Sequence, residues 1–276
     1  MPKKKMTLRQ LTKRLEAAGV EDAAFDAAQL ICRMENISHA SLMAERERDF
    51  TDPALEMAAR RREEGEPLQY ILGEWEFMGV PIKVSPACLI PRADTEVLAS
   101  LVAESLPKGG RFADLCTGSG CIAVSVLRLR PDASAAAAEL YADTFEIARE
   151  NAEMNGVDGR LELICADVCT DCLQGEFDII AANPPYIAEN EMCSLSREVQ
   201  AEPRRALTDG GDGLSIIKSI IDIYPSHLKK DGILAVEIGW QQGDTVCEYA
   251  KRHGLSAEVL LDAGGRDRVV KMQKLS

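Results

Sequence analysis

The chain has 276 residues, of which 46% are hydrophobic and 28% charged, and its formal net charge is −13. These values indicate a packed globular protein of one large or two smaller domains, and no apolar run is long enough to span a membrane. The basic start of the chain lacks the apolar region of a secretory signal, and nine cysteines without a framework spacing favour reduced thiols, so a cytoplasmic location is expected.

The acidic charge is concentrated in the later part of the chain. Residues 1–66 carry 12 Lys and Arg against 13 Asp and Glu, so −12 of the net charge lies on residues 67–276. Because such a region repels phosphates, the charge weighs against a nucleic-acid substrate. Cys165, Cys169 and Cys172 are closely spaced, but no second cysteine pair or nearby histidine completes a zinc set, so no metal is expected.

Residues 7–64 have the pattern of a small helical domain. Thr7 can cap a first helix with leucines at helical spacing, and Gly19 can end it. The charged run at residues 60–64 is interpreted as a solvated helix face, with a partner surface as the alternative. Further helices are expected over residues 23–34, near residues 41–48, and from Pro53, which follows a capping Asp, to Gly65.

Residues 67–92 differ from both flanks, because aromatic and β-branched residues alternate there with Gly and Pro. Two short strands, at 75–77 and 81–84, are typical of a hairpin. We interpret this segment as a linker between a helical domain, residues 1–66, and a larger domain, residues 93–276. The larger domain is expected to begin with a helix near residues 94–96.

A glycine-rich turn follows the first strand expected in the larger domain. The strand at residues 111–115 runs into Cys116-Thr117-Gly118-Ser119-Gly120, and a helix over 121–129 follows. This layout is typical of a loop that binds a nucleotide-type ligand, because glycines permit a tight turn and close backbone approach. The loop lacks the Lys-Ser/Thr of a P-loop and the third glycine of a dinucleotide fingerprint. A plain strand-to-helix turn is the alternative.

Two carboxylates follow at the ends of the next strands. Glu139 ends the strand at 134–139, 19 residues after Gly120, where a carboxylate can accept both ribose hydroxyls of a nucleoside. After a helix over 143–154 and a strand over 160–165, Asp167 precedes Val168 and can accept an adenine amino group. Because the loop and both carboxylates share one sheet edge, they favour an adenosine-containing cofactor without a pyrophosphate clamp, such as S-adenosylmethionine.

The strand that begins at Phe177 ends in Asn183-Pro184-Pro185-Tyr186. The prolines donate no backbone hydrogen bond and fix their own φ, so the Asn183 side chain is held on a stiff backbone at a strand end. The Asn oxygen and a Pro carbonyl can accept both protons of a planar NH2 group, while Tyr186 lies against its π-system. Fixing both protons favours a pyramidal nitrogen whose lone pair faces an electrophile. A proline-rich turn is the alternative.

The end of the chain predicts two more helices and three strands. The last two strands are joined by a glycine-rich segment, residues 262–267, which predicts a closing antiparallel hairpin. The expected elements are a long helix from 212–214 to Lys229, a strand over 233–238 that follows an Asp-Gly turn, a helix over 241–252, and strands over 257–261 and 268–272.

Together these motifs resemble the protein glutamine N5-methyltransferases, the HemK/PrmC family that modifies bacterial peptide chain release factors. The resemblance covers nearly the whole chain, and the linker and C-terminal segments are more specific than Asn-Pro-Pro-Tyr, which base amino-methyltransferases share. It is carried by residues 67–73, 89–92, 95–96, 114–120, 183–187, 202–203, 206–207, 210–214, 237–239, 241 and 268–270.

The resemblance implies an α/β fold: a Rossmann-like, seven-stranded, S-adenosylmethionine-dependent methyltransferase domain with a small all-helical N-terminal domain and a β-hairpin linker. It implies methyl transfer to the N5 amide nitrogen of the glutamine in the Gly-Gly-Gln motif of class I release factors, with the helical domain gripping that protein. A monomer that acts without nucleic acid or membrane is expected.

The resemblance also implies roles for individual residues. Catalysis falls to Asn183, Pro184 and Tyr186, and the substrate glutamine contacts these three and Pro185. The cofactor-binding residues are Asp114, Cys116, Thr117, Gly118, Ser119, Gly120, Glu139, Asp167, Val168 and Asn183. The chain departs from the family pattern at Cys116, usually Gly, at Glu139, usually Asp, and at Ala93, usually Pro.

Three other functions are compatible with the motifs. A sister enzyme would methylate a glutamine of a ribosomal protein, and the fit of the helical domain to each substrate would discriminate the two. An amino-methyltransferase of a nucleic-acid base would share Asn-Pro-Pro-Tyr, although the acidic charge opposes it. A non-catalytic binding module would keep the fold, and a turnover test would identify it.

Overall fold

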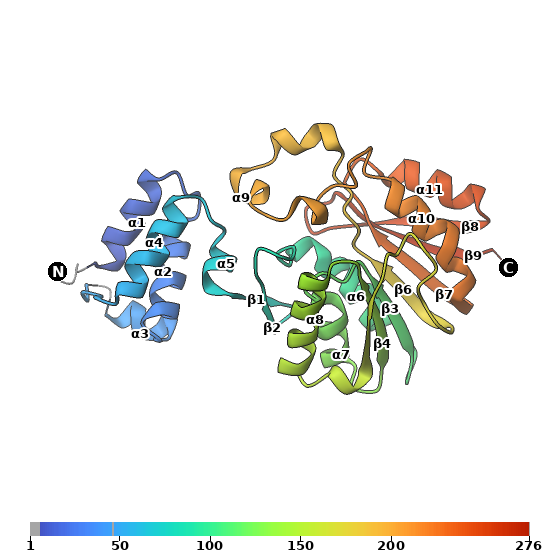
Figure 1. Cartoon of the computed structure of the whole chain (residues 1–276), viewed down its shortest axis with the longest axis horizontal. Helices are drawn as coiled ribbons and strands as arrows, with labels where there is room; N and C mark the ends of the chain where they lie inside the picture. The colour runs from blue at the N-terminus through green and yellow to red at the C-terminus, as the bar shows by residue number, and fades with distance from the viewer. Residues whose placement is uncertain (1–5, 46, 276) are drawn as a thin grey trace. The chain divides into compact units, whose positions relative to one another are not determined.

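The computed structural model describes residues 6–45 and 47–275, and its contacts divide the chain into two compact units (Figure 1). The first unit runs to Glu74 and includes the later segment Ser196–Ala201, and the second comprises Trp75–Leu195 and the chain from Glu202 onward. Segment 67–92 is therefore shared between the units. Among the described residues, no helix combines the length and apolar composition that a bilayer crossing requires.

The described part of the first unit is mainly helical, and two of its helices begin at the caps that the sequence indicated. The Thr7 side chain accepts a hydrogen bond from the Gln10 backbone, and the Gln10 side chain accepts one from the Thr7 backbone, which confirms the expected cap. Asp52 caps the helix that begins at Pro53. The helices are α1 (Leu8–Ala17), α2 (Ala23–Met34), α3 (His39–Ala44), α4 (Pro53–Glu63), α5 (Leu68–Leu72) and α9 (Arg197–Gln200).

One residue of the charged run at 60–64 corrects the expectation of a solvated face. Arg62 is only 4% exposed, and its Nε donates to Asp26 of α2 at 2.6 Å. A second ion pair joins Arg62 to Glu198 within the same unit. Arg60 is exposed, as expected. The prediction was wrong for Arg62 because a buried guanidinium is stable only with partners, and those partners lie far away in the sequence.

The second unit is built on a seven-stranded sheet with the order β5-β4-β3-β6-β7-β9-β8. The first five strands in this order are parallel, and β9 pairs antiparallel with both β7 and β8, which confirms the closing hairpin and the expected fold. The strands are β3 (Arg111–Leu115), β4 (Ser134–Glu139), β5 (Leu161–Cys165), β6 (Phe177–Ala182), β7 (Leu228–Glu237), β8 (Leu255–Leu261) and β9 (Asp267–Lys274).

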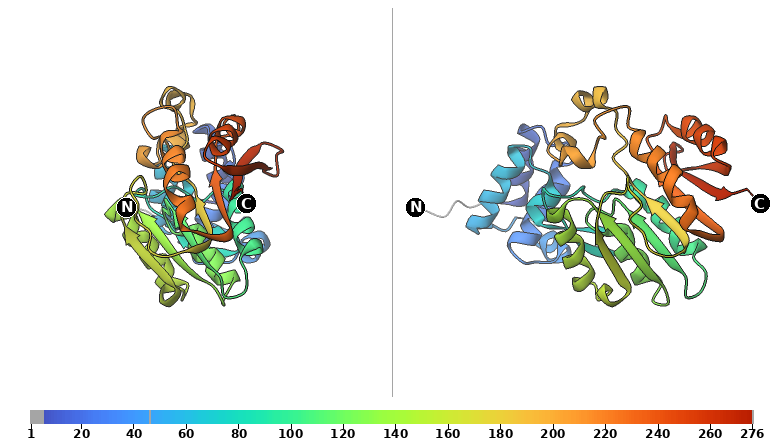
Figure 2. Two further views of the ribbon diagram at one scale, coloured as in Figure 1. Left: turned by 90° about the vertical axis from the view of Figure 1, so that its right-hand side faces the viewer. Right: turned by 45° about the vertical axis from the view of Figure 1, so that its right-hand side comes forward.

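Helices cover both faces of the sheet because its central strands are apolar on both sides. Phe112 and Ile179 point to the face contacted by α6, α7 and α8, whereas Leu115 and Ile180 belong to the core under α10 and α11. Two further views show the sheet between these groups of helices (Figure 2). The helices are α6 (Glu96–Ser105), α7 (Cys121–Leu129), α8 (Ala142–Met154), α10 (Ser215–Ile223) and α11 (Gly243–Arg252).

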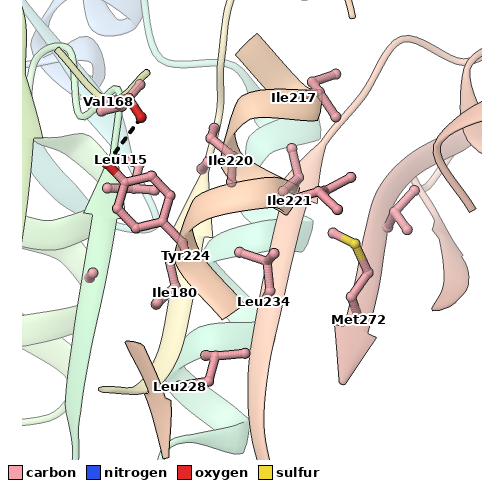
Figure 3. Packing of buried hydrophobic residues seen from close by; sticks show 14 of the residues in the cluster. Leu115, Val168, Ile180, Ile217, Ile220, Ile221, Tyr224, Leu228, Leu234 and Met272 are labelled. Atoms are coloured by element: carbon pink, nitrogen blue, oxygen red, sulfur yellow. Dashed lines mark hydrogen bonds between the residues drawn. The ribbon is translucent and has the colours of Figure 1, made fainter. Parts of the chain in front are cut away.

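Tyr224 connects this core to the turn that follows β5 (Figure 3). Its ring is fully buried beside Leu115 and Ile180, and its hydroxyl lies 3.0 Å from the carbonyl oxygen of Val168. The same hydroxyl lies 2.9 Å from the Thr170 carbonyl. A buried hydroxyl that is satisfied by the backbone fixes the turn after β5, which the sequence analysis did not foresee.

The long helix expected up to Lys229 was wrong beyond residue 223. Helix α10 ends at Ile223, and Pro225 lies in a short 3-10 turn before β7 begins at Leu228. Proline cannot donate the helical hydrogen bond, so the helix stops there. Asp231 and Gly232, expected to form a turn before the strand, lie within β7 at an irregularity of its pairing with β6, and Asp231 has φ +64°.

A hairpin of β1 (Glu74–Phe77) and β2 (Val80–Lys83) confirms the two strands expected in the linker. The buried side chain of Asn151 in α8 holds it, because Nδ2 donates to the carbonyls of Lys83 (2.9 Å) and Ser119 (2.8 Å). One amide thus joins the hairpin to the glycine-rich turn. The remaining turns are 3-10 helices: η1 (Ala93–Thr95), η2 (Asp158–Arg160), η3 (Glu189–Ser194), η4 (Arg204–Ala206) and η5 (Tyr224–His227).

Candidate functional site

A pocket in the second unit opens at the carboxyl ends of β3, β4, β5 and β6. Its empty space is about 930 Å³, the open solvent at its mouth included. Most of the residues singled out from the sequence line it: Cys116, Thr117, Gly118, Ser119, Glu139, Asp167, Val168, Asn183 and Pro185.

Asp114 and Gly120 do not line the pocket but lie behind the loop that does. Asp114 is fully buried, and its Oδ2 accepts hydrogen bonds from the Thr117 hydroxyl at 2.5 Å and from the Ala123 backbone at 3.2 Å. Burial raises the pKa of Asp114 to about 7. Its contacts therefore shape the loop from beneath.

The loop turns sharply by placing several residues in the left-handed region. Gly118 and Gly120 have φ of +58° and +79°, as glycine permits, but Cys116 also has φ +58°. Cys116, where the family usually has Gly, therefore has a strained backbone, because a residue with a side chain disfavours this left-handed conformation. A Cβ added at Gly118 would meet no atom within 4 Å, so this residue faces open space in the pocket.

Glu139 is held by the backbone on both sides of its carboxylate. Oε2 accepts from the Gly118 N–H and Oε1 from the Tyr141 N–H, each at 3.0 Å. Burial raises the pKa of Glu139, and these two hydrogen bonds oppose the rise. The carboxylate is thereby fixed at the pocket wall, as the sequence predicted. Asp167 is exposed at the next strand end, where its Oδ1 accepts from the Cys169 N–H.

Asn183 follows β6 and is oriented by a residue far away in the chain. Its Nδ2 donates to the Thr95 hydroxyl at 3.2 Å, which leaves Oδ1 as the acceptor. Thr95 stands at the start of α6, yet its side chain makes no helix-capping hydrogen bond. Thr95 also opposes the rise that burial causes in the pKa of Glu237.

Tyr186 lies outside the pocket wall, beside a buried polar network. Its hydroxyl donates to Glu237 Oε1 at 3.2 Å, and Arg268 donates to the same hydroxyl at 3.4 Å. Arg268 also forms ion pairs with Asp262 (3.0 Å) and Asp94 (3.1 Å). Burial raises the pKa of Glu237 to about 7, against the lowering effects of Thr95, Arg268 and Tyr186.

The backbone of Tyr186 also contacts Gln242 and Gly213. Gln242 Nε2 donates to the Tyr186 carbonyl at 2.9 Å, while Gln242 Oε1 accepts from the Gly239 N–H at the same distance. Gly213 approaches so closely that an added Cβ would lie 2.0 Å from the Tyr186 carbonyl oxygen, which explains a glycine there. Pro184 is buried beneath this arrangement and does not line the pocket.

Several residues of the site were not foreseen as functional. Thr95, Glu237 and Gln242 stand in segments that carry the family resemblance, but no local pattern indicated what they contact. Arg205 lines the pocket and gave no signal beyond its charge. The pocket is completed by Ala87, Cys88, Leu89, Pro91, Arg92, Thr95, Cys121, Ile122, Leu140, Tyr141, Thr144, Ala206 and Ile216.

Comparison with known families and proteins gives concordant matches. The model of the Methyltransferase small domain matches residues 93–237, and that of the PrmC N-terminal domain matches residues 7–73. A release factor glutamine methyltransferase of Nitratidesulfovibrio vulgaris is 39% identical, with 95% of this chain and 92% of the relative covered. One of Moorella thermoacetica is 37% identical, with 95% and 97% covered.

Solved structures agree on the fold. The catalytic domain of hMettl16, solved in complex with a MAT2A 3′UTR hairpin, superposes with a TM-score of 0.61 at 16% identity, covering 81% of this chain and 79% of that chain. A methyltransferase of Pyrococcus furiosus gives a TM-score of 0.55 at 18% identity, with 71% and 90% covered. At these identities the likeness shows a shared methyltransferase fold alone.

Proposed function

This chain belongs to the release factor glutamine methyltransferases, and from that membership we propose that it transfers a methyl group from S-adenosylmethionine to the glutamine N5 of the Gly-Gly-Gln motif in class I peptide chain release factors. The single observation that carries the chemistry is the Asn183 amide, oriented by Thr95 at the edge of the pocket. A cytoplasmic location and a monomeric state stay predictions.

The residues of the pocket fit S-adenosylmethionine. Glu139 offers an acceptor carboxylate for ribose hydroxyls, and Gly118 leaves the open space that a close-lying ligand needs. We propose that Cys116–Ser119, Asp167, Val168 and Asn183 complete the cofactor site, with Asp114 and Gly120 supporting it from behind. Bound there, the cofactor supplies an electrophilic methyl group on a sulfonium.

The proposed part of Asn183 is to hold the substrate amide. Its Oδ1 and the carbonyl of Pro184 accept the two N–H groups of the glutamine side chain, and Pro185 and Tyr186 shape the slot around that amide. Acceptors that hold both protons favour a pyramidal nitrogen, so these hydrogen bonds strengthen as the transition state is approached. No strong base is needed beforehand, because the alkylated nitrogen is strongly acidic and releases its proton to Asn183 or water.

Two side chains behind the slot support the proposed position of the substrate amide. Thr95 fixes which end of the Asn183 amide faces the pocket, and Gln242 fixes the Tyr186 backbone. A pre-oriented acceptor costs no reorganisation during the reaction. We further propose that the helical first unit grips the release factor, in line with the PrmC N-terminal domain matched at residues 7–73.

The test is methyl transfer from labelled S-adenosylmethionine to a purified release factor, beside a copy whose Gly-Gly-Gln glutamine is changed to Ala. Label in the first and none in the second is expected. Equal labelling of both would place the reaction at another residue. No label in either, with cofactor binding demonstrated, would contradict the proposed substrate, and a ribosomal protein and then a nucleic acid would be tested next.

A further inference from the structure

Arg205 lines the pocket on the side proposed to hold the nucleoside, and the sequence motifs assigned it no part there. It lies in η4, in the chain that returns to the second unit at Glu202. Its neighbour Arg204 has a different environment, since it is exposed and forms an ion pair with Glu189. Two adjacent arginines therefore provide a built-in comparison.

The Arg205 guanidinium joins three separate segments. Its Nη2 lies 2.7 and 2.6 Å from the two carboxylate oxygens of Asp143, at the start of α8. The same nitrogen lies 3.2 Å from the Thr144 hydroxyl and 3.2 Å from the Ala87 carbonyl. The guanidinium also stacks on the Tyr141 ring, 4.2 Å from its centroid. We call Arg205, Tyr141 and Asp143 the Arg205 clasp.

The clasp attaches the segment around η4 to the wall of the pocket, and Glu202 attaches it at another place. Glu202 is 5% exposed, accepts a hydrogen bond from the Ile90 backbone at 3.0 Å and forms an ion pair with Arg92. Both attachments lead to walls of the pocket, because Arg92 and Arg205 line it. The segment is thus fastened across one side of the pocket at two points.

The ligand-facing side of the clasp matches a nucleoside. Tyr141 and the preceding Leu140 are large apolar residues that stay 37% and 47% exposed while lining the pocket. They follow directly after Glu139, the proposed ribose acceptor. A flat base or a ribose in the pocket would cover this surface, which is otherwise left against water.

We propose that Arg205 is a positioning residue for the adenosine part of the cofactor: it closes the η4 segment over the ribose end of the pocket and holds Tyr141 as a wall of the nucleoside site. This inference rests on the proposed function, since it takes S-adenosylmethionine as the ligand. The clasp acts on retention of the cofactor, whereas Asn183 at the other end of the pocket acts on the substrate amide.

The charge of Arg205 has a second effect on the same end of the pocket. Burial raises the pKa of Glu139, and the nearby guanidinium opposes this rise together with the backbone donors. An ionised carboxylate is the better acceptor for two hydroxyls. Arg205 therefore favours the form of Glu139 that binds ribose, in addition to its part in the wall.

The test is binding of S-adenosylhomocysteine, measured by titration calorimetry on the full-length chain. For Arg205→Ala we expect Kd to rise about tenfold, because a cation that stacks on an aromatic ring and pairs with an exposed carboxylate contributes modestly at a partly exposed site. Arg205→Lys keeps the charge without the planar guanidinium, so its Kd should lie between those of wild type and Arg205→Ala. Arg204→Ala, the matched control, should bind like wild type. With saturating cofactor, kcat of Arg205→Ala should stay within about twofold of wild type.

Equal Kd values for Arg205→Ala and Arg204→Ala would overturn the inference, and so would a loss that appears in kcat alone. If Arg205→Ala does not fold, Asp143→Asn releases the clasp from its exposed partner, and an unchanged Kd in that variant would overturn the inference as well. Wild-type protein that fails to bind S-adenosylhomocysteine would instead contradict the proposed cofactor, which is a separate outcome.

Discussion

The two ends of the pocket are held in place in different ways. At the nucleoside end, apart from the Arg205 clasp, the Glu139 carboxylate is held by groups that are nearer in the sequence: it accepts from Tyr141 two residues away and from Gly118 21 residues away. At the amide end, supports come from remote segments: Asn183 contacts Thr95, 88 residues away, and Tyr186 contacts Glu237, 51 residues away. The cofactor loop is thus largely a local structure, whereas the amide slot depends on the whole domain.

This difference predicts a division of effects. A substitution at the nucleoside end should alter the affinity for the cofactor, because the groups there bind the part of the ligand that does not react. A substitution at the amide end should lower kcat, because the groups there act on the atom whose geometry changes in the transition state. The following variants test this division.

The largest expected effect is that of Asn183→Ala. Removing the acceptor that holds the substrate amide should lower kcat about 10³-fold, comparable to the loss of a group that stabilises a transition state. The Kd of S-adenosylhomocysteine should change by less than about threefold, because Asn183 is one of several residues proposed to hold the cofactor and the nucleoside end keeps all its contacts. Initial rates with labelled cofactor and a release factor give the first quantity, and calorimetry the second.

Asn190→Ala serves as the control for that experiment, because Asn190 is an exposed asparagine in η3. It should keep wild-type rates and binding. The division between the two ends would fail if Asn183→Ala turned over normally, or if its whole defect appeared as weaker cofactor binding.

Thr95→Val tests whether remote support matters. Valine has the shape of threonine but cannot accept from Asn183, so the Asn183 amide loses its fixed orientation and kcat should fall about 30-fold. Thr95→Ser restores the hydroxyl and should recover most of the rate. A Val variant as active as the Ser variant would show that the prolines alone orient Asn183.

Glu237→Gln probes the buried network behind Tyr186 through its pH dependence. The pKa of Glu237 is raised to about 7 in the folded protein, from an ordinary value of 4.5, so the folded state keeps a proton that the unfolded state releases in this range. The free energy of unfolding of wild type relative to the Gln variant should therefore fall as pH rises from about 5 to about 7, by on the order of 2 kcal/mol.

Urea unfolding of both proteins at several pH values gives that difference, and groups common to both, such as Asp114, cancel in it. A difference that stays flat over this range would mean that Glu237 is already ionised in the folded protein, because the unfolded state has lost its proton as well. The slope thus decides whether the support of the amide end contains a proton or a charge.

The contrast between the ends also explains what the sequence could reveal. The strands, the glycine-rich turn, Glu139 and Asn183 were predictable, because each depends on periodicity or on a short motif with a geometric consequence. Thr95, Glu237 and Arg205 were not recognised as parts of the site, because their partners are defined only when distant segments meet. Pro225 is a different case: its signal is local, and the helix was expected to pass through it against the ordinary rule.

The smallest expected effect is at Cys116, where the nucleoside end is strained. A residue with φ +58° favours glycine, so Cys116→Gly should be more stable than Cys116→Ala by about 1 kcal/mol, although alanine normally stabilises more than glycine. Cys165, exposed at the end of β5 and outside the left-handed region, is the matched control and should give the ordinary order. Urea unfolding of the four variants measures both pairs. The same order at both positions would mean that the cofactor turn relaxes around its cysteine, and the local support of the nucleoside end would then be flexible as well as short-range.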